Sequence, residues 1–106
     1  MPKYLIIANY TADGVKGVLA KGGTARKAAV EQSIAQAGGT LESFYFGFGD
    51  DDAYVTVDLP DNAAAASIAL QVAASGMVTT RTVVLLAPED VDRAAQAPNT
   101  YVPPGS

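Results

Sequence analysis

The sequence predicts an α+β fold in which helices cover one face of a four-stranded antiparallel sheet. Four short segments are rich in β-branched and aromatic residues, which is typical of strands. Alanine-rich segments between them are bounded by capping residues and glycines, which is typical of helices. A length of 106 residues leaves room for one domain.

The first strand is predicted to be followed by two helices. The strand covers residues 3–10, "KYLIIANY". Thr11 can cap a short helix that ends at Gly22–Gly23, and Thr24 can cap a second helix. Gly38–Gly39 closes the second helix, because glycine adopts the left-handed conformation that ends helices. The residues expected to face the core are Val15, Val18 and Leu19 in the first helix, and Ala28, Val30, Ile34, Ala35 and Ala37 in the second.

The chain after residue 39 is predicted to hold three strands and two helices. The strands are expected at residues 40–48, 53–59 and 77–87. Pro60 ends the second of these, and Asp61 or Asn62 then caps a helix over residues 63–75, with Gly76 as its stop. A last helix over residues 88–96 begins with a proline and two acidic residues, the composition expected at a helix N-terminus.

The order strand, helix, strand, strand, helix, strand indicates a ferredoxin-like βαββαβ sandwich. We assign residues 1–96 to this single domain and residues 97–106 to a proline-rich C-terminal tail. The tail lacks periodicity, so it is expected to be disordered or to lie on a neighbouring molecule as an arm.

The strands also predict self-association. Leu5, Ile6 and Ile7 follow one another in the first strand, and Val83 to Leu86 do so in the last. Continuous apolar runs indicate strands that are covered on both faces, whereas one layer of helices covers a single face. We therefore expect a homodimer that pairs through its sheets, or a higher homo-oligomer.

Composition excludes several function classes. The net charge of −4 and the scattered basic residues argue against nucleic-acid binding. The chain has no histidine and no cysteine, which removes the usual zinc and haem ligands, disulfides and the Ser–His and Cys–His nucleophiles. The apolar run Tyr4–Ala8 is too short for a signal peptide or a membrane span, so we expect a cytoplasmic protein without a membrane partner.

The run Asp50–Asp52 lies between two predicted strands. Glycine and aspartate favour turns, so a solvated hairpin turn is the first interpretation. A metal site is disfavoured because the run lacks the alternating ligand spacing of calcium loops, and we predict no metal and no cofactor. The third alternative is a contact with a ligand or a subunit, for which Asp52 is the best candidate.

Ligand-binding candidates gather where the first strand ends. Asn9 and Tyr10 lie at the mouth of the layer between helices and sheet, where pockets of this architecture open. Lys16 and Arg26 are expected near the same end and could hold an anionic ligand. Each of these residues also has an interpretation without a ligand. Asn9 could satisfy nearby backbone groups, Tyr10 could simply pack its ring in the core, and the two basic side chains could be solvated.

Arg81 lies in the middle of a predicted strand. A charge at such a position needs a partner or an exit to water. Asp58, on the polar positions of the strand over residues 53–59, is a candidate partner for a structural ion pair, within the chain or across a dimer.

Four blocks of the chain resemble the GYD domain family, over about Tyr4 to Asp92. They are "YLIIANYTADGVKG", "GGTARKAAVE", "GGTLESFYFGFGDDDAYVTVDLPD" and "TVVLLAPEDVD". In the motif that names the family, Gly49 and Asp52 match, whereas Asp51 stands where a tyrosine is expected. The resemblance implies ferredoxin-like chains that pair sheet to sheet as a dimeric α/β barrel.

The resemblance leaves two functions open. Relatives of this barrel group include cofactor-independent oxygenases, isomerases, haem degraders and ligand-sensing domains. The first hypothesis is a homo-oligomeric module that binds a small, partly apolar ligand between helices and sheet. The alternative is a cofactor-independent oxygenase or isomerase, in which Tyr10 and Asp52 would be the catalytic candidates with Asn9 beside them.

Overall fold

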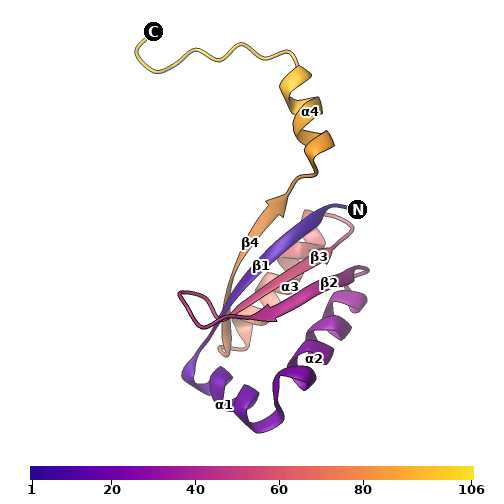
Figure 1. The fold of residues 1–106 in the computed structure, drawn as a ribbon, viewed down its shortest axis with the longest axis vertical. Coiled ribbons are helices and arrows are strands. Elements are labelled where there is room, and N and C mark those ends of the chain that lie inside the picture. The colour runs from indigo at the N-terminus through magenta and orange to yellow at the C-terminus, as the bar shows by residue number, and fades with distance from the viewer.

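The computed structural model describes residues Met1 to Ser106 and contains one open antiparallel sheet and four helices (Figure 1). The sheet has the strand order β2-β3-β1-β4, and every neighbouring pair is antiparallel. The predicted α+β class and the four-stranded sheet are therefore confirmed. The elements are β1 (Lys3–Tyr10), α1 (Ala12–Lys21), α2 (Gly23–Gln36), β2 (Thr40–Phe46), β3 (Ala53–Asp58), α3 (Asn62–Ala74), β4 (Val78–Leu85) and α4 (Pro88–Gln96).

Most helix ends follow the predicted capping chemistry. The side chain of Thr11 accepts a hydrogen bond from the Gly14 amide at the start of α1, and that of Asp61 accepts one from the Ala64 amide at the start of α3. The predicted Thr24 cap is wrong, because α2 already begins at Gly23. Gly22, at φ 88°, joins α1 to α2 with a single residue, a backbone conformation that glycine adopts readily.

The main core lies between one face of the sheet and helices α2 and α3. Tyr4 and Val57 from the sheet meet Ile34 from α2 and Ile68 from α3, and all four are buried. The predicted inner face of α2 is only partly correct, since Val30, Ile34 and Ala37 pack toward the core whereas Ala28 and Ala35 are exposed. In α1, Val15 and Leu19 are also exposed, contrary to the prediction, and Val18 is half-buried.

Helix α1 is fixed to the beginning of β4 by a close backbone approach. The Thr11 amide donates to the Met77 carbonyl over 2.9 Å, and the Thr11 hydroxyl also donates to that oxygen. Gly14 is buried one turn into α1, and a Cβ atom added to it would overlap the same carbonyl oxygen. The contact therefore depends on glycine at this position.

The opposite face of the sheet, here called the open face, carries no helix. Alternation along β1 places Leu5 and Ile7 on this face, where they pair with Val83 and Arg81 of β4 and with Thr56 and Tyr54 of β3. The apolar side chains of the open face are Leu5, Ile7, Tyr45, Tyr54, Val83 and Leu85. Tyr45, Tyr54 and Val83 are 71, 39 and 41% exposed, so part of an apolar surface remains uncovered.

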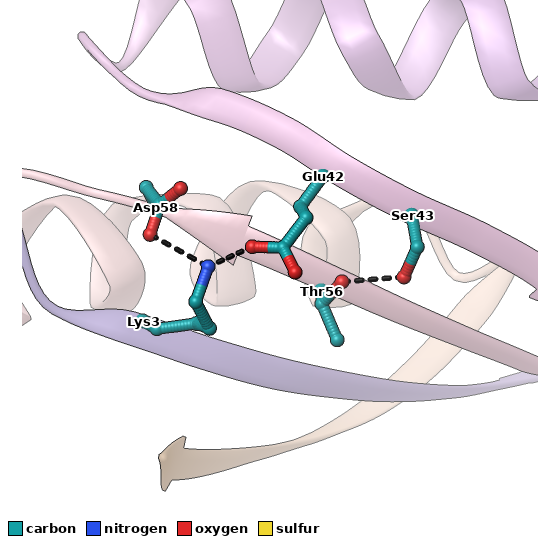
Figure 2. Close-up of polar contacts among 5 residues, drawn as sticks. All are labelled: Lys3, Glu42, Ser43, Thr56 and Asp58. Carbon is teal, nitrogen blue, oxygen red and sulfur yellow. Dashed lines mark hydrogen bonds and ion pairs between the residues drawn. The ribbon is translucent and has the colours of Figure 1, made fainter. Parts of the chain in front are cut away.

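A polar cluster lies at one end of the open face (Figure 2). The Lys3 ammonium, from β1, contacts the carboxylates of Glu42 on β2 and Asp58 on β3, the latter over 3.0 Å. The hydroxyls of Ser43 and Thr56 form a hydrogen bond between β2 and β3. These contacts join three strands across the sheet.

Helix α4 and the tail lead away from the sandwich (Figure 1). None of the residues of α4 is buried, and every residue from Ala97 to Ser106 is exposed. The radius of gyration is 16.8 Å, against about 13 Å for a compact domain of this length. We call residues 86–106 the arm.

Candidate functional site: a cavity between the helices and the sheet

A mostly apolar cavity of about 310 Å³ lies between the inner face of the sheet and helices α2 and α3. Fifteen of its 21 lining residues are hydrophobic. The other six are Arg26, Ser33, Gln71, Ser75, Thr80 and Thr82, and Tyr10, one of the fifteen, adds a hydroxyl. A mostly apolar wall with a few polar groups is the usual composition of a small-molecule site.

Two aromatic rings, those of Tyr10 and Phe44, and the guanidinium of Arg26 line this cavity, and the ring of Phe46 contacts both rings from outside. The rings of Tyr10 and Phe46 lie 6.4 Å apart between centroids, and Phe44 meets Phe46 edge to face at 5.1 Å. The guanidinium carbon of Arg26 lies 5.8 Å from the centre of the Tyr10 ring, within reach of a cation–π contact. The Nε atom of Arg26 is buried and has no hydrogen-bond partner.

A second space, of about 360 Å³, adjoins the first one. It lies between α1 and α2, and it shares with the first cavity the lining residues Tyr10, Arg26, Ala29, Met77 and Val78. Asp13 and Lys21 add charge of both signs to its lining. Tyr10 and Arg26 are the two polar residues among those that line both spaces.

The aspartate run, outside this cavity, anchors the β2–β3 hairpin to β1. The Asp51 carboxylate accepts hydrogen bonds from the Asn9 side chain over 2.8 Å and from Arg81 over 2.9 Å. The Asp52 carboxylate accepts one from the Tyr10 backbone amide over 2.9 Å, and the Asp52 amide donates to the Ala8 carbonyl. Only Asp50 fits the interpretation as a solvated turn, since it is exposed and its side chain makes no hydrogen bond or ion pair.

The predicted ion pair between Arg81 and Asp58 is wrong within the chain. Asp58 pairs with Lys3, and Arg81 pairs with Asp51. The register explains the change, because Arg81 lies opposite Ile7 whereas Asp58 lies opposite Lys3, near the other end of β1. Arg81 satisfies its charge both through Asp51 and by partial exposure to water.

The surroundings of Asp51 lower its pKa below the ordinary value of 3.8. The hydrogen bond from Asn9 lowers the pKa most. Partial desolvation raises it, and the hydrogen bond and positive charge of Arg81 lower it further. Asp51 is thus held as a carboxylate by two neighbours on the open face.

The aspartates do not converge on a common point. Asp51 turns toward the open face and Asp52 toward the backbone of β1. No group of three acidic side chains in the chain could surround a metal ion.

The structure brings together two of the five predicted ligand-binding residues. Tyr10 and Arg26 both line the cavity. Asn9 lies beside Asp51 on the open face, Asp52 bonds the backbone of Tyr10, and Lys16 is exposed on α1 without lining either space. The alternation of side chains along a strand separates Asn9 from Tyr10, and that signal is present in the sequence.

Sequence reasoning missed two contributors to the site. Phe44 lines the cavity, and Phe46 supports it from outside. Their spacing of two residues in β2 places both on one face of the strand, which could have identified them. Sequence reasoning also missed the contacts of Asp51, whose carboxylate accepts hydrogen bonds from Asn9 and Arg81.

The fold and the cavity together define a small α+β domain with a mostly apolar hollow between helices and sheet. The family model of the GYD domain matches residues 4–95. The chain therefore belongs to the GYD domain family, as the four sequence blocks predicted.

No curated protein and no solved structure matches the chain. None of its helices has both the length and the apolar character needed to cross a bilayer.

Proposed function

We propose that this GYD domain binds a small, partly apolar molecule in the cavity between its helices and its sheet. The observation that carries the proposal is the cavity itself, with its apolar wall and the Tyr10–Arg26 pair in its lining. A mostly apolar hollow of about 310 Å³ with a few polar groups has the size and composition of a small-molecule site, and this favours a ligand.

The second part of the proposal is a homodimer of ferredoxin-like chains that pair through their open faces, as in dimeric α/β barrels. It is supported by the uncovered apolar side chains Tyr45, Tyr54 and Val83. Pairing of two open faces would remove this surface from water, and apolar burial is the main favourable term in association.

The alternative of a proton-moving enzyme receives no support from the cavity. Tyr10 and Arg26 are its only titratable lining residues, and no carboxylate joins them. Asp52, the carboxylate candidate, is engaged with the Tyr10 amide outside the cavity. Because arginine stays protonated in proteins, the cavity offers no second group that could exchange a proton beside Tyr10, as an acid–base mechanism requires.

Ligand binding can be tested by native mass spectrometry of the purified protein and by NMR titration. We expect a co-purified small molecule, or shifts of cavity-lining amides on addition of small aromatic compounds. The matched variant Ala69→Trp would place an indole at a lining position and should abolish these shifts, whereas Ala66→Trp, at an exposed position of the same helix, should not. Identical binding by both variants would contradict the proposed cavity.

The dimer is tested by light scattering at micromolar concentration. Val83→Arg would place a charge in the middle of the open face and should yield monomers. Leu70→Arg, on the outer surface of α3 and 70% exposed, is the matched control and should leave the dimer intact. A soluble wild-type monomer would overturn the sheet-to-sheet pairing while leaving the ligand site untouched.

A further inference from the structure

The cavity contains one charged side chain, and that charge has no carboxylate partner. The ion pairs in the protein involve Lys3, Arg81 and Arg93, and none involves Arg26. The Nε atom of Arg26 is buried without a hydrogen bond, although the guanidinium offers several donors. A buried donor without a partner costs free energy, so it marks a place where an acceptor is missing.

The position of Arg26 is set by the start of α2. Gly23 begins the helix against the ring of Phe46, and a Cβ atom added there would lie 2.9 Å from a ring carbon. The absence of a side chain lets α2 approach the aromatic cluster, and Arg26, one turn later, lies against Tyr10. The Tyr10 ring supports one side of the guanidinium, which leaves its donor edge free for a planar acceptor.

We propose that the cavity takes a monocarboxylate with an apolar body, whose carboxylate accepts hydrogen bonds from Arg26. This inference rests on the proposed function, because it assigns a ligand class to the same cavity. The apolar body would contact Phe44 and the aliphatic wall. The planar fork of arginine matches a carboxylate in geometry and charge.

The lining argues for a single negative charge on the ligand. Arg26 is the one cation of the first cavity, and the other polar groups there are hydroxyls and an amide. A dianionic phosphate would bring a second charge into an apolar space without a second cation, which is unfavourable. Asp13, the one carboxylate that lines the adjoining space, is exposed and forms no ion pair with Arg26.

The test compares two probes that differ only in charge, 3-phenylpropanoate and 3-phenylpropanamide, by NMR titration of the full chain at pH 7. We expect the wild type to bind the carboxylate about tenfold more tightly than the amide, a ratio equivalent to about 1.4 kcal/mol. In Arg26→Gln the preference should disappear, so that the two probes bind with similar affinity. The dispersion of the backbone resonances in the same spectra reports whether the variant is folded.

Each other outcome has a distinct meaning. Equal binding of both probes to the wild type would overturn the carboxylate assignment and leave the binding function standing. Failure of both probes to bind would overturn the proposed function and this inference together. The control variant Lys21→Gln should keep the preference for the carboxylate. If Lys21→Gln loses this preference, or if Arg26→Gln keeps it, another cation recognises the charge and the assignment to Arg26 is overturned. Because the wild-type comparison needs no variant, the proposal stays testable if Arg26→Gln does not fold.

Discussion

Asp51 shows how one residue of a turn can hold two elements together. Its carboxylate joins Asn9 on β1 to Arg81 on β4, strands that are neighbours in the sheet. A turn residue would ordinarily be solvated, and the carboxylate is instead held by two donors from the strands.

The lowered pKa of Asp51 predicts an acid-sensitive contribution to stability. Because the native carboxyl has a lower pKa than the unfolded one, the unfolded state binds more protons just below pH 4, and stability rises with pH through that range. The contribution is complete above the unfolded pKa and is lost as the pH falls through the native pKa. Urea unfolding should therefore show Asp51→Asn to be destabilised at pH 7, and the difference from wild type should shrink toward pH 3. A difference that is constant with pH would contradict the assignment.

Asp52 and Asp50 give a second, direct comparison. Asp52→Ala removes the acceptor of the Tyr10 amide and should lower the free energy of unfolding by about 1–3 kcal/mol, because hydrogen bonds to charged groups are the stronger kind. Asp50→Ala should change it by no more than about 0.5 kcal/mol, as at an exposed surface site. Equal effects of the two substitutions in a urea titration at pH 7 would show that the Asp52 contact is not a stabilising one.

At the scale of elements, α1 and β4 meet through a glycine. Gly14→Ala would force the Cβ atom against the Met77 carbonyl and should destabilise the fold by about 1–3 kcal/mol, the usual cost of overpacking. Gly17→Ala, in the same helix, has open space around the new methyl group and should stabilise by about 0.4–1 kcal/mol. Thermal unfolding of both variants checks the pair. A stable Gly14→Ala protein would mean that the two elements can move apart at little cost.

Much of this element arrangement could be predicted, and the failures have physical reasons. Short β-branched runs and capping residues are local signals, which is why β1, β3 and α3 lie close to where the sequence placed them. The ion-pair partners of Arg81 and Asp58 depend on the register of the strands. Several charged residues lie on the same face of the sheet, and the sequence alone does not tell which of them come to lie opposite one another. The charge of Arg26 marks it in the sequence as a candidate for ligand binding. Its contact with Tyr10 depends on the close approach of α2 to the Phe46 ring at Gly23, which is a tertiary effect.

At the scale of the whole molecule, the arm is separate from the body. Its residues contribute nothing to the buried core. A chain that ends at Gln96 should therefore unfold with the same free energy as the full chain, within about 0.5 kcal/mol, in urea at a fixed protein concentration. A loss of stability that depends on protein concentration would instead show that the tail lies on a second subunit, since association makes apparent stability concentration-dependent.

The anchoring of the hairpin tip has a consequence for the order of folding events. The contacts of Asp51 with Asn9 and of Asp52 with Tyr10 each join residues 42 positions apart. Strands β2 and β3 are joined by a short loop and can pair before so long a segment closes. Asp52→Ala should then accelerate unfolding and leave the folding rate near that of the wild type, which stopped-flow kinetics in urea would show. Slower folding with an unchanged unfolding rate would mean that the tip docks onto β1 before the barrier is crossed.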